Sequence, residues 1–200
     1  MYLNIGESKQ IEKQSNFIFR NKDSMITKDN LHKVLDKLGF VKSGALFLKH
    51  FSNHGCDIQV DFSEGKIIYP SNLETGANTT TNFSQPENFV VLECVCRLLE
   101  KGYEPQTIFL EKSWTLGHTG KSGRADITVY DKDDKGNPQQ VYLIIECKRA
   151  GSDYKDARKE MFEDPDGKQL FSYWAQARSA KWLQLYASDY DEEKDEINVE

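Results

Sequence analysis

Val141-Tyr-Leu-Ile-Ile-Glu-Cys-Lys148 contains the longest apolar run of this 200-residue sequence and ends with an acid and a lysine. Side chains two residues apart on a strand share a face, so Glu146 and Lys148 project together while Ile145 and Cys147 face the core. Charged groups on a buried strand are costly unless they are paired or hold a metal. The stretch therefore predicts a central strand that carries a charged site.

A second acid belongs to the same site. Asp126 lies in Gly123-Arg-Ala-Asp-Ile127, twenty residues before Glu146, and the polar turn at residues 131–138 separates the two segments. A hairpin pairing of these strands places Asp126 beside Glu146. Two carboxylates suit Mg²⁺, with Mn²⁺ as a possible substitute, because such hard ions prefer oxygen ligands and accept phosphate oxygens. Lys148 is then expected to orient a nucleophile or stabilise developing charge.

The rest of the chain divides into three parts. Residues 1–82 predict a small α+β segment of unassigned role, with an amphipathic helix that ends at Gly39 and two or three strands after it. Residues 83–188 predict an α/β unit in which a helix, three strands, a helix and a strand form a small mixed sheet. Residues 189–200 hold seven acids and one lysine, which predicts a solvated linker towards a missing C-terminal region.

Composition excludes several classes of protein. The net charge of −6 comes from the last twelve residues, so the remaining body is neutral and compatible with nucleic-acid binding. No run reaches the ~18 apolar residues of a membrane helix, and the N-terminus has no hydrophobic signal core. The four cysteines lack CxxC spacing, which predicts reduced thiols and a cytoplasmic location.

Asp126 followed by Glu146-x-Lys148 resembles the PD-(D/E)xK nuclease motif, although Ala125 stands where the motif has proline. Gln169-Leu-Phe-Ser-Tyr173 resembles the QxxxY motif of the RecB-like branch, which includes the nuclease domain of type I restriction endonuclease R subunits. The resemblance covers roughly residues 84–188. It implies a restriction-endonuclease-like core and a Mg²⁺-dependent endodeoxyribonuclease that cleaves double-stranded DNA, with Gln169 and Tyr173 supporting the site and touching DNA.

Three further residues complete the predicted site. The resemblance implies a metal-binding glutamate on the first helix of the core; Glu87 is the leading candidate and Glu93 the alternative. Either side chain could instead be solvated or serve the helix dipole. Lys121 and Arg124, in the polar loop before Asp126, are candidates for contacts to DNA phosphates.

The loop Gly117-His-Thr-Gly-Lys-Ser122 imitates a phosphate-binding loop, but Thr115 stands where the first glycine belongs and a strand follows. We therefore expect no ATP site in this chain. The type I resemblance implies a separate translocase region and methyltransferase and specificity subunits as partners, with no membrane. Two alternatives stay open: a RecB-like recombination or repair nuclease, and a catalytically silent DNA-binding or assembly module of the same fold.

Overall fold

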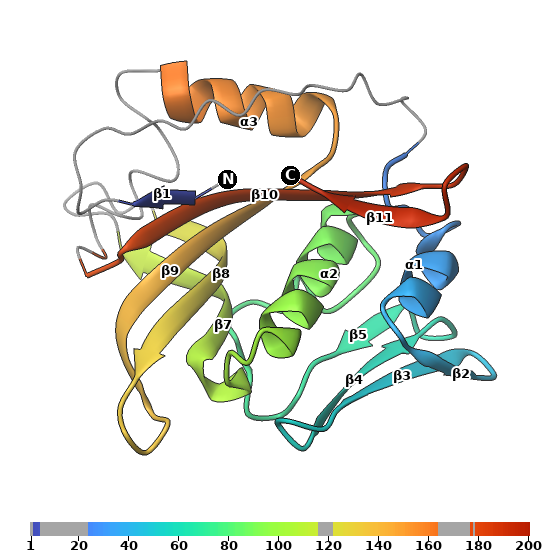
Figure 1. The fold of residues 1–200 in the computed structure, drawn as a ribbon, viewed down its shortest axis with the longest axis horizontal. Helices are drawn as coiled ribbons and strands as arrows, with labels where there is room; N and C mark the ends of the chain where they lie inside the picture. Colours follow the sequence, from blue (N-terminus) through green and yellow to red (C-terminus); the bar gives the residue numbers. More distant parts are fainter. Residues whose placement is uncertain (1, 5–23, 116–121, 164–176, 178) are drawn as a thin grey trace.

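The computed structural model describes residues 2–4, 24–115, 122–163, 177 and 179–200. This part of the chain has a mixed α/β architecture with three helices and two sheets (Figure 1). The helices are α1 (Leu31–Lys37), α2 (Glu87–Glu100) and α3 (Ser152–Glu163), and a short 3-10 turn, η1, spans Pro105–Thr107. None of the helices in this part of the chain could span a membrane.

The larger sheet carries the predicted site. Its strands run in the order β1-β10-β9-β8-β7-β6, and β11 also pairs with β10. The strands are β1 (Tyr2–Asn4), β6 (Glu74–Thr75), β7 (Ile108–Thr115), β8 (Ser122–Lys132), β9 (Pro138–Arg149), β10 (Trp182–Asp191) and β11 (Glu196–Val199). The pairs β6–β7 and β9–β10 are parallel and the others are antiparallel, so the sheet is mixed as predicted.

The smaller sheet is antiparallel and has the order β2-β3-β4-β5. Its strands are β2 (Val41–Ser43), β3 (Leu46–Phe51), β4 (Cys56–Asp61) and β5 (Lys66–Ile68). Helix α1 precedes it and buries Leu31, Val34 and Leu35, the spacing that the sequence predicts, and Gly39 follows the helix with φ 80°.

Helix α2 lies between the two sheets (Figure 1). Eleven of its fourteen residues are buried because one face packs on the larger sheet and the opposite face packs towards the smaller one. Helix α3 covers the other face of the larger sheet, where Tyr154 and Met161 pack with Ile144 and Leu183. The main core contains buried residues from both sides of residue 82, and the boundary between residues 82 and 83 stays a prediction.

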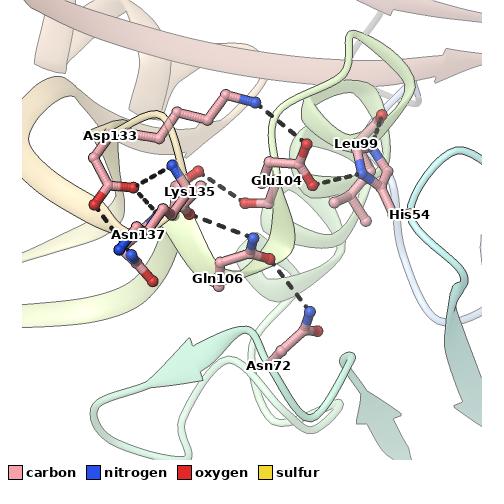
Figure 2. Close-up of polar contacts among 11 residues, drawn as sticks. His54, Asn72, Leu99, Glu104, Gln106, Asp133, Lys135 and Asn137 are labelled. Carbon is pink, nitrogen blue, oxygen red and sulfur yellow. Dashed lines mark hydrogen bonds and ion pairs between the residues drawn. The ribbon is translucent and has the colours of Figure 1, made fainter.

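A polar bridge joins the smaller sheet to the β8–β9 hairpin (Figure 2). His54, in the β3–β4 turn, has a buried side chain. Its Nδ1 lies 3.2 Å from Glu104 Oε2, and its Nε2 lies 2.9 Å from the carbonyl oxygen of Leu99. Glu104 also accepts a hydrogen bond from Lys132 Nζ at 3.3 Å. Gln106 continues the bridge, because its Nε2 donates to the Gly136 carbonyl at 3.4 Å.

The acidic tail is not a solvated linker, so this prediction is wrong. Strand β10 extends to Asp191, and β11 pairs with it in antiparallel register from Ser188↔Val199 to Asp191↔Glu196. Asp189 is completely buried and accepts a hydrogen bond from Asn198 at 2.7 Å. Residues 192–196 are exposed at the turn, whereas Asp189 is buried in the sheet, and a count of acids does not distinguish these two environments.

Candidate active site

Strand β9 presents Glu146 and Lys148 as the sequence predicts. Ile145 and Cys147 are fully buried on the core side, whereas Glu146 is 4% exposed and Lys148 keeps about a fifth of its side chain exposed. Lys148 Nζ donates to Glu146 Oε1 at 2.7 Å. The alternation of the strand therefore brings the acid and the lysine into direct contact.

Asp126 reaches the same site from β8. The pair Ile127↔Ile145 sets the register, so Asp126 and Glu146 lie level on adjacent strands. Asp126 Oδ2 accepts a hydrogen bond from the backbone N–H of Cys147 at 2.7 Å. This bond holds the Asp126 carboxylate next to Cys147, the residue between Glu146 and Lys148 on β9.

Helix α2 adds the third carboxylate. Glu87, the first residue of α2, accepts a hydrogen bond from Lys148 Nζ at 3.1 Å. Glu93, the alternative, is completely buried and instead contacts Arg97 Nε and the hydroxyl of Tyr186. The structure thus brings Glu87, and not Glu93, to Lys148.

The site holds three carboxylates around one ammonium group. Burial raises the pKa of Asp126 well above its usual value, and the charge of Glu146 raises it further. Burial also raises the pKa of Glu146, although Lys148 opposes the shift. Burial lowers the pKa of Lys148, but the charges of Glu146, Asp126 and Glu87 outweigh this effect and raise it. Lys148 therefore stays protonated, and the carboxylates keep an excess of negative charge when ionised.

One oxygen of this site has no partner in the described chain. Glu146 Oε2 is buried and forms no hydrogen bond there, while Oε1 of the same carboxylate contacts Lys148. A buried oxygen without a partner is costly, and a bound cation would remove that cost. The residues fit Mg²⁺, which proteins commonly hold through one or two carboxylates while it keeps several waters.

The carboxylates do not form a closed metal cage. Within the residues that the structure describes, no three His, Cys, Asp or Glu side chains are grouped closely enough to hold a metal ion together. Glu87 and Glu146 both contact the Lys148 ammonium group. Asp126 and Glu146, level on adjacent strands, are the candidates for direct ligands, and Glu87 is linked to Glu146 through Lys148.

The structure describes only some of the remaining predicted site residues. Arg124 is about half exposed, and its Nη2 lies 3.6 Å from Glu111 Oε1. Lys121, Gln169 and Tyr173 lie outside the described residues, so the QxxxY motif stays a prediction. The sequence analysis missed Glu111, a buried acid on β7; the available signal was a charge directly after the apolar Ile108-Phe-Leu110.

A comparison with curated proteins finds no match for this sequence. A family model described as the type I restriction enzyme R protein N terminus matches residues 86–185. The matched segment runs from the residue before α2 into β10 and contains Glu87, Asp126, Glu146 and Lys148. Because this match covers half of the sequence, the chain belongs to the family of type I restriction enzyme R protein N-termini.

Proposed function

We propose that this chain is a Mg²⁺-dependent endonuclease domain of the PD-(D/E)xK type that hydrolyses phosphodiester bonds in double-stranded DNA. Family membership supports a restriction-related nuclease function, in assembly with other restriction–modification subunits and with DNA. The observation that carries the proposal is the buried Glu146 Oε2, which lacks a partner in the described chain beside two further carboxylates.

Each residue has a distinct role in this proposal. Asp126 and Glu146 hold the metal, and the Cys147 N–H keeps Asp126 oriented towards it. Bound Mg²⁺ supplies an acidified water and neutralises charge on the phosphate. Lys148, kept protonated by its carboxylate neighbours, orients the nucleophile and stabilises charge that develops on the phosphate oxygens. Glu87, on α2, accepts a hydrogen bond from Lys148 and helps to hold it.

The residues assigned to DNA contacts are distinct from the cluster of carboxylates. Arg124 is on the strand that carries Asp126 and is exposed enough to meet a phosphate. Lys121, Gln169 and Tyr173 take the same supporting and DNA-binding roles through the family resemblance. In this function the chain has no ATP site, and translocation belongs to another region of the enzyme.

Metal binding tests the proposal without requiring DNA translocation. We expect calorimetry at pH 7.5 to show that the chain binds Mg²⁺ and Mn²⁺ and that Asp126→Ala and Glu146→Ala each remove the binding. Asp133→Ala is the matched control, since Asp133 is a carboxylate in the exposed β8–β9 turn. If the wild-type chain binds no metal, or if both site variants bind as well as wild type, the silent-module alternative replaces this proposal.

A further inference from the structure

Glu111 lies across from the proposed metal ligand Asp126. The pairs Leu110↔Ile127 and Lys112↔Ala125 flank these two residues on β7 and β8. Glu111 has φ 55°, a left-handed conformation that only Asp195 shares with it among the non-glycine residues that the structure describes. Such a conformation is costly for a residue with a Cβ and persists where the surroundings enforce it.

The surroundings that hold Glu111 are the loop at residues 79–82. The carboxylate of Glu111 is 2% exposed and accepts hydrogen bonds from the Thr79 N–H at 3.1 Å, from the Thr79 hydroxyl, and from the Thr80 hydroxyl at 3.4 Å. Gly76, just before the loop, lies so close that a Cβ there would be 2.4 Å from the Glu111 carbonyl oxygen. The loop is therefore fastened to β7 at the level of Asp126.

The same loop holds the first turn of α2. The buried Asn88 donates through Nδ2 to the carbonyl oxygens of Thr79 at 2.7 Å and of Asn82 at 2.8 Å. Both side-chain N–H groups of Asn88 have an acceptor in this arrangement. The preceding residue, Glu87, is the one that contacts Lys148. One loop thus connects the strand position opposite Asp126 to the helical turn that carries Glu87.

We propose that Glu111 and Asn88 are positioning residues that act through the 79–82 loop to hold Glu87 and Lys148 in place relative to Asp126. This inference rests on the proposed metal-dependent nuclease site. The side-chain hydrogen bonds of both residues are formed with the loop, and Glu111 Oε1 also lies 3.6 Å from Arg124 Nη2. Neither residue contacts a proposed metal ligand through these bonds, so their effect on metal binding is indirect. Partners of this kind commonly change metal affinity by about 10-fold or more when they are removed.

Two substitutions release the loop from opposite ends. Glu111→Gly removes the carboxylate, and glycine adopts the left-handed φ without strain, so the backbone of β7 is preserved. Asn88→Asp keeps the shape but replaces the amide nitrogen, which donates both hydrogen bonds, with a carboxylate oxygen that faces two carbonyl oxygens. Glu111→Gln is the rescuing variant, because its amide can accept from the Thr79 N–H and donate to the Thr79 hydroxyl. Thr81→Ala is the matched control, since the Thr81 hydroxyl donates to the carbonyl oxygen of Asn78, just before the loop, and not to Glu111 or Asn88.

Mn²⁺ binding to the whole chain is measured by calorimetry for each variant, and urea unfolding measures its stability. We expect Glu111→Gly and Asn88→Asp each to weaken binding about 10-fold, and the double variant to lose no more than either alone, because both act through one loop. Glu111→Gln and Thr81→Ala should bind within about twofold of wild type.

Two results overturn the inference. In the first, Glu111→Gly and Asn88→Asp leave Mn²⁺ affinity unchanged while Glu146→Ala removes it, so the metal site stands and the positioning role fails. In the second, the double variant loses about 100-fold, which shows two independent structural effects. If Glu146→Ala binds Mn²⁺ as well as wild type, the proposed function itself is wrong. If Glu111→Gly does not fold, Asn88→Asp alone decides: a loss of Mn²⁺ affinity supports the inference, and an unchanged affinity overturns it.

Discussion

Two buried glutamates of this protein have opposite surroundings. Glu93, in the middle of α2, meets one cation and one hydroxyl, and each of its oxygens has a partner: Arg97 for Oε1 and Tyr186 for Oε2. Glu146, on β9, shares Lys148 with Glu87, lies level with Asp126, and has one buried oxygen without a partner in the described chain. The Glu93 cluster (Glu93, Arg97, Tyr186) is balanced in charge, whereas the Glu146 cluster (Glu146, Asp126, Glu87, Lys148) carries surplus negative charge.

This difference distinguishes a structural ion pair from the proposed cation site. Burial of a carboxylate is tolerated when its charge and its lone pairs are satisfied, and the Glu93 cluster meets both conditions. The Glu146 cluster meets neither in full, and the raised pKa values of Asp126 and Glu146 record that cost. Variants that break one cluster should therefore behave differently from variants that break the other.

The largest expected effect is on the balanced cluster. Arg97→Met leaves the fully buried Glu93 without its cation and should lower the free energy of unfolding by about 3 kcal/mol, the low end for such pairs because Arg97 is partly exposed. Urea unfolding measures the loss, and Mn²⁺ affinity should stay unchanged. The double variant Glu93→Gln/Arg97→Met should recover most of the stability; if it does not, packing of the Arg97 stem and not charge explains the loss.

A second satisfied group sharpens the comparison. His54→Ala removes a buried ring that contacts Glu104 and the Leu99 carbonyl, and it should cost about 2 kcal/mol of unfolding free energy (Figure 2). His50→Ala, which removes an exposed partner of Asp57, should cost less than about 0.5 kcal/mol. Equal losses in the two variants would contradict the role assigned to the polar bridge.

Removing a charge from the Glu146 cluster should raise the stability of the metal-free chain, whereas removing Arg97 from the Glu93 cluster lowers it. Asp126→Asn keeps an oxygen to accept from the Cys147 N–H but removes a charge from the surplus. Without metal, at pH 7.5 with a chelator, we expect the variant to be about 1 kcal/mol more stable than wild type, and to gain no stability from Mg²⁺. Asp133→Asn is the control: exposed hydrogen bonds lower the pKa of Asp133, so its neutralisation should not stabilise the chain. A destabilised Asp126→Asn would show that the charge supports the fold.

The smallest expected effect is a pH dependence of the metal-free chain. Because folding raises the pKa values of Asp126 and Glu146 above 3.8 and 4.5, their stabilising contribution is complete below those values and is lost as pH rises through the folded pKa values. Unfolding measured with a chelator from pH 5 to pH 8 should therefore show wild type losing about 0.5 kcal/mol relative to Asp126→Asn. If the unfolding free energies of wild type and Asp126→Asn change in parallel from pH 5 to pH 8, the folded pKa values lie outside this range and the prediction is wrong. Mg²⁺ binding should strengthen over the same interval, since the metal needs ionised ligands.

Local pattern was enough to predict how the central residues of the candidate site are placed. Strand alternation gave the shared face of Glu146 and Lys148, and a short polar turn implied that β8 and β9 pair, which brings Asp126 to Glu146. The helix that carries Glu87 was predicted from Pro86 and the apolar residues after it. The choice between Glu87 and Glu93 needed the structure, because it depends on where α2 docks against β9 and β10.

Features that depend on distant contacts escaped the sequence analysis. Glu111 has its role only because a loop 32 residues earlier supplies the donors, and its left-handed backbone leaves no trace in composition. The tail was misjudged for the same reason: its acids meet lysines of α1, with Lys33 at 3.0 Å from Glu192, rather than solvent alone. Composition reports how many charges a segment has, but not which neighbours the fold provides.

The hairpin of β10 and β11 has a consequence for how the chain is handled. Ala187 exchanges hydrogen bonds with Glu200 in both directions, and the pairing continues to Asp191. Truncation before residue 192 would leave these backbone groups of β10 without their β11 partners and create an open strand that other chains could pair with. A shortened version of this protein would therefore be expected to self-associate, even though the residues removed are mostly acidic.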